Sequence, residues 1–239
     1  MNIKKISIII PAYDEEATIE TILNKVLSVK LKYEKEIIVV NDGSKDSTPK
    51  IVEKLQKKHK NVSLYNKKNG GKGSAIRLGF KKATGDIFIV QDADLEYEPN
   101  EYNSLLKPFE KGMKIVYGSR VLKQRKKGKG FFKGKHPNAG LMAYVGGRTV
   151  TIFTNLLFGS KLTDEPTCYK CFKKKVLKNI KIKGKDFSWE PEVTAKLLKK
   201  GYKIQEIPIS YYPRTSDEGK KINWKDGVIA LWTLIKYRF

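Results

Sequence analysis

The segment IFIVQDADLE, residues 87–96, joins four consecutive apolar residues to three acidic residues at alternate positions. An apolar run of this length is typical of a strand buried on both faces of a parallel sheet. Because side chains alternate along an extended strand, Asp92, Asp94 and Glu96 can point to the same side at its carboxyl end. Their oxygens suit Mg²⁺ or Mn²⁺, so the segment predicts a metal site at the edge where open parallel sheets bind ligands. The alternative is a polar exit from the strand into a loop.

Length and composition indicate a globular protein. The chain has 239 residues, of which 40% are hydrophobic, and includes ten Phe, twelve Tyr and three Trp. This content favours a buried core and argues against disorder. The length suits one large α/β domain or two small ones.

The two cysteines, Cys168 and Cys171, are too few for a disulfide framework, which is typical of a reducing compartment. A structural zinc site needs four ligands, and the sequence has neither a second cysteine pair nor a suitably placed histidine pair. We interpret both residues as ordinary thiols. No signal peptide is visible before the first predicted strand at 6–10, and we expect a cytoplasmic protein.

Positive charge is concentrated in the second half of the chain. Residues 1–119 carry 21 basic and 16 acidic side chains, whereas residues 120–239 carry 28 and 9. The densest run is KQRKKGKGFFKGK at 123–135. This asymmetry predicts a polyanionic partner on one side of the molecule, such as nucleic acid, an anionic bilayer or a phosphorylated substrate. A general lysine bias is the alternative, and the many lysines on the predicted helices support it in part.

Strands and helices alternate in the first half of the chain. Strand patterns lie at 6–10, 36–40, 62–65, 87–90 and 114–117, and helical patterns lie at 17–29, 49–59, 74–83 and 101–111. The second helix has a start signal in DSTP (46–49), a polar cap before an early proline. This alternation predicts a parallel sheet with right-handed crossovers.

Polar and glycine-rich segments follow four of these strands. They are PAYDEE (11–16), NDGS (41–44), NGGKGS (69–74) and the acidic segment described above. In a parallel sheet these ends meet at one edge, where a ligand binds. The turn at 69–74 departs from the Walker A and dinucleotide patterns, but its amides and Lys72 are suited to an anion cradle at a helix start.

The four segments resemble, in order and spacing, those of the family 2 glycosyltransferases, which have the GT-A nucleotide-sugar fold. The matching stretches are IIIPAYDE (8–15), VVNDGS (39–44), NGGKG (69–73) and DAD (92–94). The resemblance implies a single α/β domain over 1–239, with a mostly parallel sheet flanked by helices. Residues 1–120 are then the nucleotide-sugar half, and residues 121–239 face the acceptor and the membrane.

The resemblance also implies roles for individual residues of the donor site. Three residues border the nucleotide: Pro11, Tyr13 and Glu15. Asp42 accepts a hydrogen bond from the base, and Lys72 and Gly73 lie in the glycine-rich turn of the donor site. Asp92 and Asp94 hold a metal ion on the diphosphate. Position 14 is Asp where the family often has Asn, a mild departure that leaves the loop assignment intact.

Within this family, the chain resembles the polyprenyl-phosphate sugar synthases, the group that includes dolichyl-phosphate mannose synthase. The shared features are DADLE (92–96) followed by Pro99, YGSR (117–120), and YPR (212–214) with Lys220 and Lys221. In that group the residue matching Glu96 is commonly Gln and joins the metal site. Arg120, Arg214 and Lys220 correspond to cations that hold the phosphates of donor and acceptor. Because TDEPTCYKCF (163–172) departs from the mannose synthase pattern, the sugar (mannose or glucose) and the donor (GDP- or UDP-hexose) stay open.

The expected chemistry follows from the charges. Expulsion of a nucleoside diphosphate builds negative charge that a divalent cation and fixed basic groups stabilise, and direct displacement inverts the anomeric centre. A polyprenyl (dolichyl) phosphate, with a second pKa of about 6, is largely a dianion at pH 7 and needs no strong base. A sugar hydroxyl in cell-surface glycan synthesis is the alternative acceptor. It requires a carboxylate base, for which Asp164, Glu165 and Glu190 are candidates.

Two apolar segments in the second half suggest contact with lipid. Residues 139–158 are apolar but contain Gly146, Gly147, Arg148 and Asn155, and a central Arg costs a membrane-spanning helix at least about 2.5 kcal/mol. We therefore expect an interfacial or partly buried helix pair there, and an amphipathic helix at 228–239. With the basic run 123–135, they predict a peripheral protein on the anionic cytoplasmic face of a membrane. Packing of the last helix against the sheet is the alternative.

Two non-enzymatic functions are alternatives to the transferase. A nucleic-acid-binding protein would explain the net charge of +24, but it should interleave basic residues with stacking aromatics. The acidic residues at 92–98 would also repel a phosphate backbone, so we expect no nucleic-acid partner. A membrane scaffold without activity would not need the metal and nucleotide residues.

Overall fold

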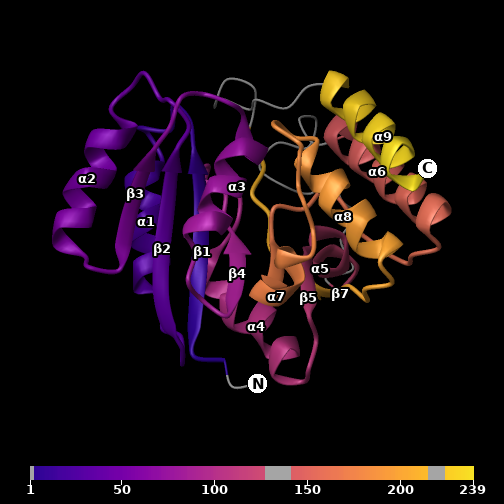
Figure 1. The fold of residues 1–239 in the computed structure, drawn as a ribbon, viewed down its shortest axis with the longest axis horizontal. Helices are drawn as coiled ribbons and strands as arrows, with labels where there is room; N and C mark the ends of the chain where they lie inside the picture. Colours follow the sequence, from indigo (N-terminus) through magenta and orange to yellow (C-terminus); the bar gives the residue numbers. More distant parts are fainter. Residues whose placement is uncertain (1–2, 127–140, 215–223) are drawn as a thin grey trace.

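The computed structural model describes residues 3–126, 141–214 and 224–239. Within these residues a central sheet is flanked by helices (Figure 1), which confirms the predicted α/β class. The strands are β1 Lys5–Ala12, β2 Glu34–Asn41, β3 Val62–Asn66, β4 Ile87–Val90, β5 Ile115–Ser119, β6 Lys170–Lys173 and β7 Gln205–Pro208. The helices are α1 Ile19–Ser28, α2 Thr48–Lys58, α3 Lys72–Lys82, a short 3-10 turn Pro99–Glu101, α4 Tyr102–Glu110, α5 Arg120–Lys126, α6 Leu141–Phe158, α7 Lys174–Lys178, α8 Trp189–Lys199 and α9 Trp224–Arg238.

The sheet is mostly parallel, as predicted. Its strands are ordered β3-β2-β1-β4-β6-β5-β7, and the first four run parallel to one another. The exception is β6, which pairs antiparallel with both β4 and β5. The five predicted strands are confirmed, whereas β6 and β7 were not predicted.

The strands of the first half are apolar on both sides because helices cover both faces of the sheet. Ile8 and Ile10 of β1 pack in one cluster with Ile22 and Val26 of α1. Ile9, between them, points to the other face and packs with Ala75 of α3 and with β2. The apolar spacing of three and four residues along α1 therefore builds one side of the core, and it matches the helix expected at 17–29.

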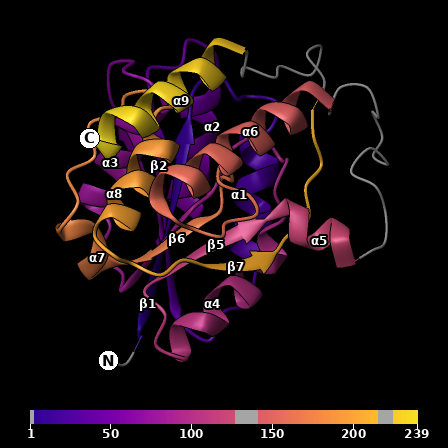
Figure 2. The ribbon, with the colours of Figure 1, turned by 90° about the vertical axis from the view of Figure 1, so that its right-hand side faces the viewer.

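The prediction of a helix pair at 139–158 was wrong, because α6 is one continuous helix in residues 141–158. The helix at 228–239 is confirmed as the greater part of α9. Helices α6, α8 and α9 lie side by side at one end of the sheet (Figures 1 and 2), joined by the buried Val150, Ala195 and Leu234. No described helix has the combination of length and apolar character that a membrane span requires.

Candidate functional site

The predicted donor residues meet at the carboxyl edge of β1, β2 and β4. Glu15 follows β1, Asp42 follows β2, and Asp92 and Asp94 follow β4. The loops after β1 and β2 are tied together, since Asp14 N donates to Ser44 Oγ (3.0 Å) and Glu15 N to Thr48 Oγ1 (2.9 Å). Pro11 and Tyr13 border this edge and are half-buried.

Lys72 lies between two carboxylates, the half-buried Asp92 and the buried Glu190. Its Nζ is 2.9 Å from Asp92 Oδ1 and 3.1 Å from Glu190 Oε1. Burial favours the neutral amine, but Asp92 and Glu190 outweigh it and hold the pKa of Lys72 well above its usual value. Burial also raises the pKa of Glu190, and within the described residues its Oε2 has no hydrogen-bond partner. Lys72 is thus a fixed cation beside Asp92.

Arg214, from the second half of the chain, reaches the other acids of the site. Its Nη2 lies 3.3 Å from Asp94 Oδ2 and its Nη1 3.5 Å from Glu15 Oε2. Glu96 is held by its neighbours: Oε1 accepts from Arg214 N (2.8 Å) and Oε2 from Tyr211 OH (3.0 Å). The site therefore joins residues more than a hundred positions apart.

The turn that carries these acids has an unusual backbone. Leu95 lies between Asp94 and Glu96 with a φ of 64°, a left-handed conformation that branched and bulky residues rarely adopt. Asp94 Oδ1 accepts from Glu96 N at 3.1 Å across this turn. The turn replaces the extended alternation that the sequence predicted, so Asp94 and Glu96 share the site through a tight bend.

Negative charge exceeds positive charge at this edge. Burial, and then the neighbouring Asp92 and Glu96, raise the pKa of Asp94 to about 7. An acid perturbed in this way favours an added cation, and paired carboxylates are suited to Mg²⁺ or Mn²⁺. Among the described residues, no three His, Cys, Asp or Glu side chains are arranged to hold a metal ion. Asp92 contacts Lys72, and Asp94 contacts Arg214.

The glycine-rich turn contacts the chain's own backbone. A Cβ on Gly73 would lie 2.5 Å from Gly184 O, and one on Gly71 would lie 2.6 Å from Lys185 O. Ser74 N donates to Lys185 O at 3.0 Å. The glycines therefore allow the 184–186 backbone to approach, which explains them without an open anion cradle. This covering segment was not predicted, although two glycines around one lysine signalled a close backbone contact.

Asp42 binds the far end of the same turn. Its carboxylate accepts from Gly70 N (3.1 Å) and from the ammonium of Lys67. Asp42 is buried, and these partners fix its orientation. Its predicted role, accepting a hydrogen bond from the base of a nucleotide, stays a prediction.

Arg120, predicted to hold phosphate, is paired with Asp164. Its Nε and Nη2 donate to the two oxygens of Asp164 at 2.8 and 2.7 Å, and its guanidinium stacks 4.9 Å from the centre of the Tyr211 ring. Asp164 and Glu165, two of the candidate bases, are thus engaged: Asp164 with Arg120, and Glu165 with the buried Lys170 at 3.4 Å. The remaining candidate, Glu190, lies beside Lys72. Lys220 and Lys221 lie outside the described residues, as does most of the basic run 123–135.

Solved structures define the fold class. Glucosyl-3-phosphoglycerate synthase from Mycobacterium tuberculosis, in complex with Mn²⁺, UDP and glucosyl-3-phosphoglycerate, aligns with a TM-score of 0.73 and 18% identity over 98% of this chain and 80% of that chain. The same enzyme with Mg²⁺ and UDP gives a TM-score of 0.72 and 17% identity, covering 98% and 79%. The chain therefore has the GT-A fold.

Residues 7–181 match the model of Glycosyl transferase family 2. The chain belongs to this family.

Curated relatives include three enzymes named for dolichol or dolichyl phosphate. Dolichol-phosphate mannosyltransferase from Pyrococcus furiosus is 35% identical over half of this chain and 34% of its own length. Dolichyl-phosphate beta-glucosyltransferase ALG5A from Trichomonas vaginalis is 28% identical, covering 86% of this chain and 65% of the relative. UDP-N-acetylglucosamine–dolichyl-phosphate N-acetylglucosaminyltransferase from Methanococcus voltae is 30% identical, covering 86% and 85%. The chain thus spans about a third of the Pyrococcus relative and about two thirds of the Trichomonas relative.

Proposed function

We propose that the chain transfers a hexose, mannose or glucose, from a GDP- or UDP-sugar to a polyprenyl (dolichyl) phosphate, with inversion at the anomeric carbon. The observation that carries this proposal is the joining of Asp92 and Asp94 to Lys72 and Arg214 at one sheet edge. Acids and fixed cations together suit a diphosphate that leaves with a divalent cation. The names of the relatives from Pyrococcus, Trichomonas and Methanococcus support a lipid-phosphate acceptor.

Asp92 and Asp94 would hold Mg²⁺ or Mn²⁺, with Glu96 nearby, and the ion would neutralise the charge of the leaving diphosphate. Two basic residues of the chain would bind phosphate groups. Lys72 holds its ammonium beside Asp92, and Arg214 would contact a phosphate after moving away from Asp94. The transfer requires no general base, because an acceptor phosphate is already ionised near pH 7.

The proposed acceptor enters from a membrane. Helices α6 and α9 expose a set of large apolar side chains, which we call the α6–α9 apolar surface: Val145, Ile152 and Leu156 on α6, and Trp224, Val228, Ile229 and Trp232 on α9. Leu156 is 77% exposed, and Trp224 and Trp232 are 74% and 64% exposed. Exposed tryptophans near basic residues such as Lys225 and Lys236 suit a lipid headgroup region. We propose that this surface rests on an anionic membrane, on its cytoplasmic face.

A second candidate function is transfer to a sugar hydroxyl. Glu190 favours it, because this acid lies at the site with a raised pKa and a buried Oε2 that has no partner in the described residues. A hydroxyl acceptor needs a base of this kind.

The test is a transfer assay with purified protein, each of GDP-mannose, UDP-glucose and GDP-glucose, and a short polyprenyl phosphate in the presence of Mn²⁺. We expect one donor to give a product that mild acid releases as sugar, and the corresponding nucleoside diphosphate to raise the unfolding temperature. Transfer to a hydroxyl glycan, with none to the lipid phosphate, would instead support the second candidate function.

A further inference from the structure

The residue before Asp92 is a fully buried polar side chain. Gln91 follows β4, and its backbone N donates to Ile9 O at 3.0 Å, which continues the sheet ladder by one residue. Its side chain is 0% exposed. A buried amide that is left without partners is costly, so the position of Gln91 in the core calls for specific hydrogen bonds.

Gln91 makes three such bonds. Its Oε1 accepts from Tyr102 OH at 2.6 Å and from Tyr169 OH at 2.8 Å, and its Nε2 donates to Asp92 O at 2.9 Å. Tyr102 begins α4 and Tyr169 precedes β6, so the amide joins two elements to the strand end. Both tyrosines are fully buried.

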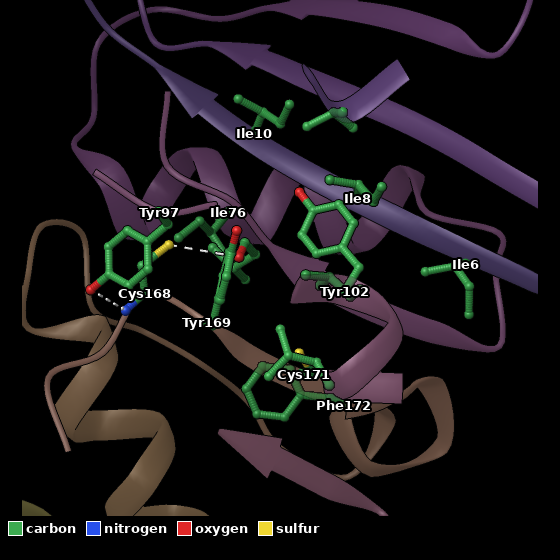
Figure 3. Close-up of a cluster of buried hydrophobic side chains, with 14 of the residues drawn as sticks. Ile6, Ile8, Ile10, Ile76, Tyr97, Tyr102, Cys168, Tyr169, Cys171 and Phe172 are labelled. Carbon is green, nitrogen blue, oxygen red and sulfur yellow. Dashed lines mark hydrogen bonds between the residues drawn. The ribbon is translucent and has the colours of Figure 1, made fainter. Parts of the chain in front are cut away.

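The two tyrosines are themselves held by packing. Their rings meet edge to face with centroids 5.8 Å apart, and Tyr97 packs on Tyr169 at 5.0 Å. Figure 3 shows Tyr97 and Tyr169 beside Cys168, whose backbone N donates to Tyr97 OH at 3.2 Å. Cys168 Sγ in turn contacts Val90 O at 3.6 Å. The oxygen of Gln91 is therefore fixed by residues that have little freedom to move.

We propose that Gln91 is a positioning residue for the metal and diphosphate site, acting through Asp92. By holding Asp92 O, its amide fixes the peptide plane that follows Asp92 and so restrains the backbone that carries the Asp92 carboxylate. An apolar side chain of similar volume would fill the same place in the core, but it would leave two tyrosine hydroxyls and one carbonyl without these partners. The inference rests on the proposed metal role of Asp92.

The test compares Gln91→Met with Tyr117→Phe. The first removes all three hydrogen bonds of the amide. The second is a matched control, because it removes another buried hydrogen bond, between Tyr117 OH and Thr194 Oγ1 at 3.0 Å. Affinity for Mn²⁺ alone is measured by the electron paramagnetic resonance signal of the free ion, and stability by thermal unfolding. We expect Gln91→Met to weaken Mn²⁺ binding about tenfold or more, as loss of a group that orients a ligand does, and Tyr117→Phe to leave it within about twofold.

Two further variants keep the outcome decisive. If Gln91→Met does not fold, the double variant Tyr102→Phe, Tyr169→Phe removes the anchors of the amide while keeping Gln91, and it should weaken Mn²⁺ binding more than Tyr117→Phe does. Equal Mn²⁺ affinity in this double variant and the Tyr117→Phe control would overturn the positioning role. Asp92→Asn separates the two proposals: if it leaves Mn²⁺ affinity unchanged, the metal role of Asp92 fails and the inference falls with it. If it abolishes binding while Gln91→Met does not weaken it, only the inference fails.

Discussion

Arg214 Nη2 lies 3.3 Å from Asp94 Oδ2, although the two residues are 120 positions apart in the chain. This contact places a cation from the second half directly on an acid from the first half. It also means that Arg214 occupies one of the carboxylates that a divalent cation needs. The candidate site is thus completed by the second half of the chain, and Arg214 balances part of its negative charge.

The two central acids should govern metal binding. We expect Asp92→Asn and Asp94→Asn each to abolish transfer while the protein remains folded, and excess EDTA to abolish transfer by the wild type. A sugar-release assay and thermal unfolding measure these effects. Full activity in EDTA would remove the metal assignment.

Metal affinity should depend on pH in a defined direction. Because the pKa of Asp94 is raised to about 7, this acid is mostly protonated below pH 7 and cannot ligate a cation. We expect Mn²⁺ affinity to rise between pH 6 and pH 8 and to level off above, as the carboxylate ionises. Titrations of Mn²⁺ at several pH values test this, and Asp94→Asn should remove the dependence along with most of the affinity. A constant affinity over this range would contradict the role of Asp94.

Arg214 should matter for the acceptor more than for the nucleotide. A charge-assisted hydrogen bond to phosphate contributes roughly 1.5–3 kcal/mol. We therefore expect Arg214→Ala to slow transfer at least about tenfold while nucleotide affinity changes by less than about threefold. The matched control is Lys123→Ala, which removes one positive charge that is paired with Glu101 at 3.2 Å. A large loss of nucleotide affinity in Arg214→Ala would place this cation in the donor site.

Arg120 should contribute mainly to stability. Its partner Asp164 has a side chain that is 4% exposed, and removal of one member of a buried pair leaves an uncompensated charge at a cost of about 3–5 kcal/mol. We expect Arg120→Ala to lower the free energy of unfolding by about this amount in urea titrations. Lys32→Ala is the control, since it breaks the exposed pair with Glu110, and exposed pairs contribute little to stability. If Arg120→Ala leaves the free energy of unfolding unchanged but abolishes transfer, the result would instead support the phosphate-binding role that the sequence implies for Arg120.

Ionisation of Glu36 should make the free energy of unfolding depend on pH in the acid range. Burial disfavours its charge, but hydrogen bonds from Ser7 and Thr84 and the ammonium of Lys5 outweigh this and lower the pKa of Glu36 to about 2. Its stabilising effect is therefore fully present above about pH 4.5 and is lost as the pH falls towards 2. After allowance for solvent screening, we expect Glu36→Gln to destabilise the fold by about 1–2 kcal/mol at pH 7.

At pH 2.5 the difference between Glu36→Gln and the wild type should be much smaller. The control is Glu34→Gln, because Glu34 contacts the same Lys5 at 3.1 Å but its side chain is 69% exposed. That variant should show little effect at either pH. Denaturant titrations at pH 7 and pH 2.5 make the comparison, and equal losses at both values would contradict the linkage to ionisation of Glu36.

The sequence predicted the first half of the fold well because its pattern is local. Buried strands at 6–10 and 87–90 read as apolar runs, and α1 reads as an apolar stripe. It did not predict β6, because this strand begins with the buried Lys170, whose ammonium lies over the Tyr117 ring at 4.1 Å. A lysine in a short segment gives no sign of burial until its partners from distant parts of the chain are known.

The sequence indicated several residues of the candidate site, but it did not indicate which of them form ion pairs with one another. Asp92, Asp94 and Arg214 were singled out from the sequence, whereas the pairing of Lys72 with Glu190 depends on how α8 packs against α3. The pairing of Arg120 with Asp164 depends likewise on the loop before β6. The tight turn at Leu95 was not foreseen either, because an extended strand was the simplest geometry for alternating acids.

The antiparallel direction of β6 has a consequence for the loop that precedes it. Its neighbour β4 ends at the ligand edge of the sheet, whereas β6 begins there. The residues just before β6 therefore lie near Asp92, and the strand that follows them is paired with β4 on one side and β5 on the other. An insertion at the exposed Lys161 would lengthen the loop that leads into β6 without shifting the register of any strand. Strand pairing therefore sets no limit on the length of this loop.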